Sequence, residues 1–180
     1  MRVVGGIARG RSLKAPASAT VRPTSARARE AIFDALGHIG GVDGASVLDL
    51  FAGSGALGIE ALSRGAAEAD LVDSSAAAVA AIRRNLSAVG ADANVRRQDA
   101  LRYLDGARRD ARQYDLVFLD PPYRRASALG RELSAALAPV LAADARVVAE
   151  SDRRAPLELD LELLDERRYG DTLIRIHGPR

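Results

Sequence analysis

The sequence predicts an α/β fold built on a mostly parallel, seven-stranded sheet, and two patterns lead to this prediction. From residue 46 onward, short apolar runs of strand length alternate with longer segments of helical periodicity. Near the C-terminus, apolar and polar residues alternate on either side of a glycine turn, which is typical of an antiparallel hairpin. Repeated β-α units place helices on both faces of a parallel sheet, so we expect a covered sheet that ends in the hairpin.

The first two β-α units occupy residues 46–89. Residues 46–51 and 69–73 are apolar runs of strand length, and we expect a strand in each. A glycine turn precedes residues 56–64, which are expected to form a helix. A second helix is expected at residues 75–89, with apolar side chains at helical spacing. These side chains are Val79, Ile82 and Leu86.

The remaining elements continue the same alternation. Residues 94–97 predict a short third strand and residues 114–120 a fourth, which contains the apolar run from Leu116 to Leu119. A helix at 126–137 and a strand at 145–150 follow. Residues 157–168 and 172–177 surround Tyr169-Gly170-Asp171 and predict the terminal hairpin.

The N-terminal part of the chain is strongly basic, because no acidic residue occurs before Glu30. A solvated tail is the simplest alternative for such a segment. Residues 2–11, however, resemble two short strands around a glycine turn, and residues 25–36 predict a helix with one apolar face. We therefore expect an ordered basic extension over residues 1–40, followed by the main domain at 41–180, and a surface suited to phosphate.

Composition excludes several kinds of chemistry. The chain of 180 residues contains no Cys, which rules out disulfides, thiolate ligands and a Cys nucleophile. No apolar run approaches the roughly 20 residues of a membrane span. Neither a metal-ligand cluster nor a signal peptide is visible, so we expect a cytoplasmic protein without a metal and, by default, a monomer.

The most informative motif is Asp120-Pro121-Pro122-Tyr123, which directly follows the fourth predicted strand. Two prolines end the strand, because they lack the N–H group that a ladder needs. The motif then presents a carboxylate, bare backbone carbonyls and an aromatic ring. These groups suit an amino group on a flat base, with the carboxylate and carbonyl as acceptors and the ring as a stacking platform.

A glycine-rich turn follows the first predicted strand. Gly53, Gly55 and Gly58 satisfy G-x-G-x-x-G, which is found in dinucleotide sites and in other nucleoside-type cofactor sites. Asp49, placed before the glycines, would repel a pyrophosphate but suits a cationic ammonium. This preference favours S-adenosylmethionine, which carries an ammonium and a sulfonium and no phosphate, over a nicotinamide dinucleotide.

Two further acids follow the next two predicted strands. Asp73 lies about 20 residues beyond the glycines, where an acid commonly binds ribose hydroxyls. Asp99 could accept from an adenine amino group, with the Ala100 N–H as a neighbouring donor, but an acid in this place is often only a helix cap. Ligands of parallel sheets bind at the carboxyl ends of the strands, where these acids are expected to meet.

Together these motifs resemble those of the class I S-adenosylmethionine-dependent amino-methyltransferases, which have a Rossmann-like fold, and more narrowly those of the RsmD family. RsmD proteins are bacterial 16S ribosomal RNA guanine-N2 methyltransferases. One departure is Asp73, where the family more often has Glu. The residues that carry the resemblance are Asp49-x-Phe51-x-Gly53-x-Gly55, Asp120-Pro121-Pro122-Tyr123, Val4-Gly5-Gly6, Arg9-Gly10-Arg11, Arg22-Pro23-Thr24, Arg27, Arg29-Glu30 and Tyr169-Gly170-Asp171-Thr172.

The resemblance implies methyl transfer from S-adenosylmethionine, with S-adenosylhomocysteine as product, to the exocyclic N2 of a specific guanine in 16S rRNA within an assembled or assembling 30S subunit. The implied catalytic residues are Asp120, Pro121, Pro122 and Tyr123. The implied cofactor-binding residues are Asp49, Phe51, Ala52, Gly53, Gly55, Asp73, Asp99 and Ala100. The expected RNA-binding residues are Arg2, Arg9, Arg11, Lys14, Arg22, Arg27 and Arg29.

Three alternatives remain open at this point. The first is an amino-methyltransferase for another RNA or DNA base, such as adenine at N6, because Asp-Pro-Pro-Tyr occurs in those enzymes too. The second is a nicotinamide-dependent oxidoreductase, supported by the glycine pattern alone. The third is a non-catalytic RNA-binding protein on a relic methyltransferase fold.

Overall fold

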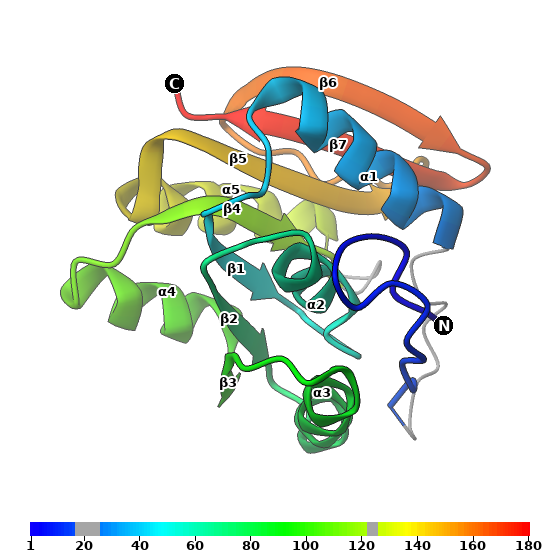
Figure 1. Cartoon of the computed structure of the whole chain (residues 1–180). Coiled ribbons are helices and arrows are strands. Elements are labelled where there is room, and N and C mark those ends of the chain that lie inside the picture. Colours follow the sequence, from blue (N-terminus) through cyan, green and yellow to red (C-terminus); the bar gives the residue numbers. More distant parts are fainter. Residues whose placement is uncertain (17–25, 122–125) are drawn as a thin grey trace.

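The computed structural model describes residues 1–16, 26–121 and 126–180 (Figure 1). Pro122, Tyr123 and Arg22, which the sequence places in the candidate sites, therefore lie outside the described residues. In chain order the elements are α1 (Ala26–Ile39), β1 (Ser46–Leu50), α2 (Ala56–Ser63), β2 (Glu68–Asp73), α3 (Ala76–Val89), β3 (Asn94–Arg97), α4 (Ala100–Arg109), β4 (Tyr114–Leu119), α5 (Ala126–Leu137), the 3₁₀ turn η1 (Ala138–Val140), β5 (Leu141–Asp152), β6 (Glu162–Tyr169) and β7 (Thr172–Gly178).

A seven-stranded sheet in the order β3-β2-β1-β4-β5-β7-β6 forms the centre of the protein. β3, β2, β1, β4 and β5 are parallel to one another, whereas β7 is antiparallel to both β5 and β6. The predicted fold class is thus confirmed, including the terminal hairpin, whose turn contains Gly170 at φ 63°. Among the described residues, no helix is both long enough and apolar enough to cross a membrane.

Helices cover both faces of the sheet (Figure 1). On one face, α1, α2 and α3 bury apolar side chains against residues such as Leu71, Phe118 and Ile174. On the other face, α4 and α5 pack against residues such as Leu50 and Val117. This arrangement leaves the carboxyl ends of the parallel strands as the edge at which loops converge.

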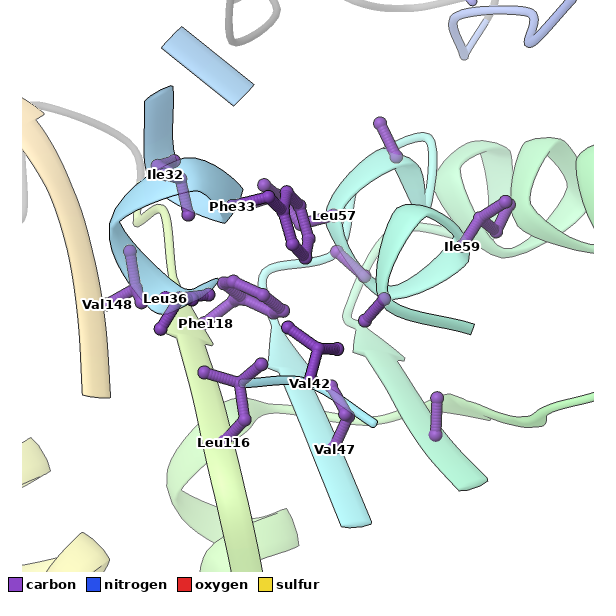
Figure 2. Packing of buried hydrophobic residues seen from close by; sticks show 14 of the residues in the cluster. Ile32, Phe33, Leu36, Val42, Val47, Leu57, Ile59, Leu116, Phe118 and Val148 are labelled. Carbon is purple, nitrogen blue, oxygen red and sulfur yellow. The ribbon is translucent and has the colours of Figure 1, made fainter. Parts of the chain in front are cut away.

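Helix α1 is part of the main core. Figure 2 shows Ile32, Phe33 and Leu36 of α1 directed at Phe118 and Val148 of the sheet. The Phe33 and Phe118 ring centroids are 5.7 Å apart with an interplanar angle of 53°, a favourable tilted geometry. The N-terminal 16 residues contribute Val3, Ala8 and Leu13 to the same cluster. Residues 1–40 therefore share their core with the sheet. That they form a separate RNA-binding extension stays a prediction.

The N-terminal segment forms a loop closed by an isolated antiparallel bridge between Arg2 and Ser12, in place of the expected pair of strands. Val3 N donates to Arg11 O at 3.0 Å, and Gly10 N donates to Val3 O at 2.9 Å. The ladder does not extend further, because the next amides, those of Val4 and Gly5, donate to the Glu60 carboxylate on α2 instead.

Helix α4 is an element that the sequence analysis did not anticipate. Its buried residues, Ala100, Tyr103, Leu104 and Ala107, do follow helical spacing. The segment is otherwise rich in Arg and Asp, and it is held to the rest of the protein by polar contacts. The Tyr103 hydroxyl donates to Asp70 Oδ2 at 2.6 Å, within a buried cluster that also contains Tyr114. This tertiary contact compensates for the low apolarity of the helix.

Candidate active site

The candidate site lies at the carboxyl edge of the sheet, around the point where the strand order reverses. β1 lies between β2 and β4, so the loops that leave β1 and β4 diverge there, as they do at ligand sites of α/β sheets. The glycine-rich turn follows β1, and Asp120 follows β4 directly. Asp73 is the last residue of β2, and Asp99 follows β3 by two residues. The described motifs thus share one edge, as the sequence predicts.

The glycine-rich turn has a strained backbone that brings main-chain groups to this edge. Phe51 has φ 64°, a value that a non-glycine residue rarely adopts, and Gly53 and Gly55 have φ 58° and 76°. Ala52 N donates to Val72 O at 3.0 Å, which holds the start of the turn on β2. Strain of this kind occurs at ligand-binding turns more often than elsewhere.

Asp73 braces this turn from the neighbouring strand. Its Oδ2 accepts from Gly53 N at 2.9 Å, and its Oδ1 accepts from Ser75 N at 2.8 Å. Both oxygens therefore contact backbone amides on two loops of the candidate site. A carboxylate can accept more than one hydrogen bond per oxygen, so this bracing role is compatible with the expected contact to ribose hydroxyls.

Asp49 lies beneath the turn and is almost fully buried, with 2% of its surface exposed. Its Oδ2 accepts from Gly58 N at 3.0 Å, in the first turn of α2. Burial raises the pKa of Asp49 from 3.8 to about 7. The Gly58 bond lowers the pKa, and the nearby Asp73 raises it further. A cation bound beside Asp49 would remove part of the cost of ionising it.

This pKa predicts a pH-dependent stability. The folded state prefers protonated Asp49, so its contribution is fully present below pH 3.8 and is lost as the pH rises towards 7. We expect the Asp49→Asn variant, which mimics the protonated form, to gain stability relative to the parent over this range. The gain should approach about 1.4 kcal/mol per pH unit in urea unfolding. A stability difference that does not change between about pH 4 and 7 would contradict this assignment.

Asp99 caps helix α4. Its Oδ1 accepts from Leu101 N at 3.1 Å and Arg102 N at 3.2 Å, so the helix-cap alternative holds for this oxygen. Asp99 is nevertheless exposed at the site edge, and Ala100 is buried behind it. The roles of Asp99 and Ala100 in adenine recognition remain predictions.

Asp120 and Pro121 end β4 at the centre of this edge. Asp120 is half-buried and Pro121 is buried. The flanking Leu119 is paired with both Leu50 of β1 and Ala149 of β5, so the backbone that leads into Asp120 is held on both sides. The sheet thereby gives the carboxylate a rigid base. The catalytic roles predicted for Asp120 and Pro121 stay predictions.

The predicted RNA-binding cations differ in their exposure to solvent. Arg2, Arg9, Arg11, Lys14 and Arg27 are exposed. Arg29, by contrast, is 1% exposed, and its Nη2 donates to Arg2 O at 2.8 Å. The prediction that Arg29 contacts RNA phosphates is therefore wrong. Its place on the inward face of α1 removes the guanidinium from solvent.

The whole chain is similar to known proteins. A family model described as "Conserved hypothetical protein 95" matches residues 1–178. The "Putative rRNA methyltransferase YlbH" of Bacillus subtilis is 39% identical over 190 residues, covering 100% of both chains. The "Ribosomal RNA small subunit methyltransferase D" of Escherichia coli K12 is 41% identical over 126 residues, which cover 69% of this chain and 61% of that protein. The chain belongs to the RsmD family.

Two solved structures are similar to this chain along its whole length. A hypothetical protein of Thermus thermophilus has a TM-score of 0.87 at 35% identity, covering 99% of each chain. The "Putative methyltransferase yhhF" of Escherichia coli has a TM-score of 0.82 at 34% identity, covering 100% of this chain and 98% of that chain. These matches support the fold over its full length.

Two side chains of this RsmD-family chain, which hold the N-terminal segment beside the glycine turn, were not predicted from the sequence. Asn85 on α3 donates to Lys14 O at 2.9 Å and to Ser54 O at 2.8 Å, and accepts from Lys14 N at 2.8 Å. Glu60 on α2 is fully buried and accepts from Val4 N and Gly5 N at 2.7 and 2.6 Å. The available signal was a polar residue on an otherwise apolar helix face, since Asn85 shares that face with Ile82 and Leu86.

Proposed function

We propose that this chain transfers a methyl group from S-adenosylmethionine to the exocyclic N2 of a specific guanine in 16S rRNA, as a cytoplasmic monomer acting during assembly of the small ribosomal subunit. The observation that carries the proposal is the meeting of Asp120-Pro121 with the glycine turn at the switch point between β1 and β4. The two RsmD-family relatives named as rRNA methyltransferases support the substrate class.

The residues at this edge fit the proposed methyl donor. A Cβ built on Gly53 would meet only Phe51 O, at 3.9 Å, so a ligand has room beside this backbone. Asp73 supplies negative charge beside the turn, and a bound cation would favour the ionised form of Asp49 beneath it. This pair of carboxyl groups suits an ammonium and disfavours a pyrophosphate. S-adenosylmethionine would supply an electrophilic methyl group on a sulfonium. Within the described ranges, no group of three or more His, Asp or Glu side chains could hold a metal ion.

The chain's own contribution is to orient the acceptor amine. The lone pair of an exocyclic guanine amine is delocalised into the ring, which makes it a poor nucleophile. The Asp120 carboxylate and the Pro121 carbonyl would accept its two hydrogens, favour a pyramidal nitrogen and aim the lone pair outward. Tyr123 would stack on the base, which is worth roughly 1–3 kcal/mol in comparable contacts.

The proposed reaction is a direct displacement. The amine lone pair forms the new N–C bond as the C–S bond breaks, and the electron pair of the broken bond stays on the sulfur of S-adenosylhomocysteine. The methylated nitrogen then loses one proton to Asp120 or to solvent. Alignment supplies up to about 7–11 kcal/mol in such reactions. A strong general base is not required, because the nitrogen becomes a good acid once it is methylated. The guanine must leave its stack to reach the edge.

The exposed cations of the N-terminal segment are the proposed RNA contact. The Arg9→Glu/Arg11→Glu double variant should bind 16S rRNA more weakly and show a shallower salt dependence. Each lost phosphate contact should reduce the log–log slope by roughly 0.7–0.9. The matched control is Arg108→Glu/Arg109→Glu on α4, which carries the same charge change on the opposite face of the sheet. Equal losses in both variants would argue against a specific N-terminal surface.

Two measurements test the proposed function itself. Isothermal titration should detect binding of S-adenosylmethionine and S-adenosylhomocysteine but no binding of NADH. Binding of NADH alone would support the oxidoreductase alternative. Mapping of modified nucleotides in rRNA from cells that lack this protein should show the loss of one N2-methylguanine in 16S rRNA. An unmethylated adenine in its place would redirect the proposal to adenine N6.

A further inference from the structure

Arg29 of α1 is a buried charge near the candidate site. Its side chain is 1% exposed and lies one helical turn before Ile32 and Phe33, which face the sheet. Burying a guanidinium costs several kcal/mol unless carboxylates and hydrogen bonds compensate for the lost water. The identity of those compensating groups indicates what Arg29 does.

One set of partners belongs to the N-terminal segment. Arg29 Nη2 donates to Arg2 O at 2.8 Å, and Nη1 contacts Met1 Sδ at 3.8 Å. The same sulfur accepts from the Ser54 hydroxyl, in the glycine turn, at 3.5 Å. The first two residues of the chain therefore lie between α1 and the turn that follows β1.

The other partners are two buried carboxylates, Glu60 of α2 and Glu150 of β5, which are 0% and 4% exposed. Desolvation lowers the pKa of Arg29, and attraction to both carboxylates opposes this effect. Glu150 follows Ala149, whose strand partner is Leu119, so it lies level with Asp120 on the neighbouring strand. It shares a sheet face with Val148, the face that α1 covers (Figure 2).

Glu60 connects this charge cluster back to the basic loop. Its two oxygens accept from Val4 N and Gly5 N, and its Oε1 also accepts from Arg64 Nε at 2.9 Å. The loop then continues to the exposed Arg9 and Arg11. The N-terminal loop is therefore hydrogen-bonded both to Glu60 and, through Arg2 O, to Arg29. The Arg29 guanidinium is in turn attracted to Glu60 and to Glu150, which lies on the strand beside Asp120.

We propose that Arg29 is a positioning residue for methyl transfer, which ties the N-terminal RNA-contacting segment to the strand ends that carry Asp120. This inference rests on the proposed function. A planar guanidinium reaches several acceptors at once, whereas an ammonium acts as a single point charge. RNA held by the exposed cations would then be presented to Asp120 at a fixed distance, which is what near-attack alignment requires.

Arg29→Met and Arg29→Lys test this role with purified full-length protein, 16S rRNA and S-adenosylmethionine. We expect Arg29→Met to lower kcat/KM for RNA by about 10- to 100-fold, because small misplacements have effects of this size. Arg29→Lys should lie between Arg29→Met and the parent. Affinity for S-adenosylmethionine should change by less than about threefold in both. The matched control is Arg167→Met, which removes an arginine that also contacts α1, at Ala31 O, but whose ion pair is with Asp165 of β6.

Hydrogen exchange gives a readout that a general loss of stability would not reproduce. The amides of Val3, Gly10 and Leu13 hold the N-terminal segment together and should exchange faster in the Arg29 variants. The Ala52 amide, which is bonded to β2, should keep its protection. If Arg29→Met does not fold, the kinetic and the hydrogen-exchange measurements are made on Arg29→Lys.

The outcomes separate the two proposals. A parent protein that binds S-adenosylmethionine but does not methylate 16S rRNA would overturn the proposed function. The Arg29 proposal alone would be overturned if the parent is active and the Arg29 variants fold with parental RNA kinetics and parental exchange at Val3 and Leu13. Faster exchange at Ala52 as well as at the N-terminal amides would overturn it too, because Arg29 would then have a purely structural role.

Discussion

Replacing Asp120 with Ala is expected to abolish methyl transfer while leaving the fold and cofactor binding intact. The residue follows β4 at the strand-order switch point and is half-buried, so its loss removes an acceptor without opening a large cavity. Without that acceptor the amine keeps its planar, delocalised form and loses its alignment. We expect single-turnover methylation to fall by at least about 100-fold, since orientation is the main source of rate in this proposal.

Two further variants sharpen this experiment. Asp120→Asn keeps the size and one acceptor oxygen but loses the charge, so it should retain more activity than Asp120→Ala if hydrogen bonding to the amine is what matters. Asp105→Ala, on the exposed surface of α4, is the matched control for removing a carboxylate and should leave the rate unchanged. Parental single-turnover rates in a folded Asp120→Ala protein would refute the role proposed for this residue.

Replacing Gly58 with Ala is expected to destabilise both the fold and the candidate site. A Cβ on Gly58 would lie 2.1 Å from Leu71 Cδ2 and 3.3 Å from Asp49 Oδ2. Leu71 is fully buried, so α2 would have to move away from β2. Overpacking of this kind typically lowers the free energy of unfolding by about 1–3 kcal/mol. Because Gly58 N donates to Asp49, affinity for S-adenosylmethionine should fall as well.

Gly106→Ala provides the control, with an effect of opposite sign. Gly106 is inside α4, and a Cβ built there meets no heavy atom within 4 Å. Alanine in a helix interior stabilises by roughly 0.5–1 kcal/mol relative to glycine. Urea unfolding should therefore show a lower free energy of unfolding for Gly58→Ala, and a higher one for Gly106→Ala, than for the parent. Gly58→Ala with parental stability and parental cofactor affinity would contradict the close packing of α2 on β2.

Local patterns predicted most of the fold, because the apolar spacing of the elements matches their burial. The helix expected at residues 56–64 is α2 at Ala56–Ser63, and β3 and α5 have the predicted bounds. One exception is the N-terminal segment, which forms a loop closed by a single bridge in place of the expected strands. The other is α4, whose Arg-rich segment is stabilised by Asp70 from β2 and by the Asp99 cap that precedes the helix.

Position along the chain also predicted which edge would carry the candidate site. Acids in the last residues of a parallel strand, or just after it, must lie at the same edge of the sheet. Topology alone therefore places Asp49, Asp73, Asp99 and Asp120 at that edge. How deeply each group is buried could not be predicted in this way. Asp49 is enclosed beneath α2, and Arg29, which reads as one more surface cation, points into the core.

Fold class, the edge that holds the site and the chemistry of its groups were therefore predictable from residue order, because they depend on local periodicity and on the succession of elements. The environment of each charge was not, because burial and partners depend on contacts between segments that are distant along the chain. Arg29 illustrates the difference. Residue type suggested a phosphate contact, whereas its contacts with Arg2 and its attraction to Glu60 and Glu150 make it part of the support for the candidate site.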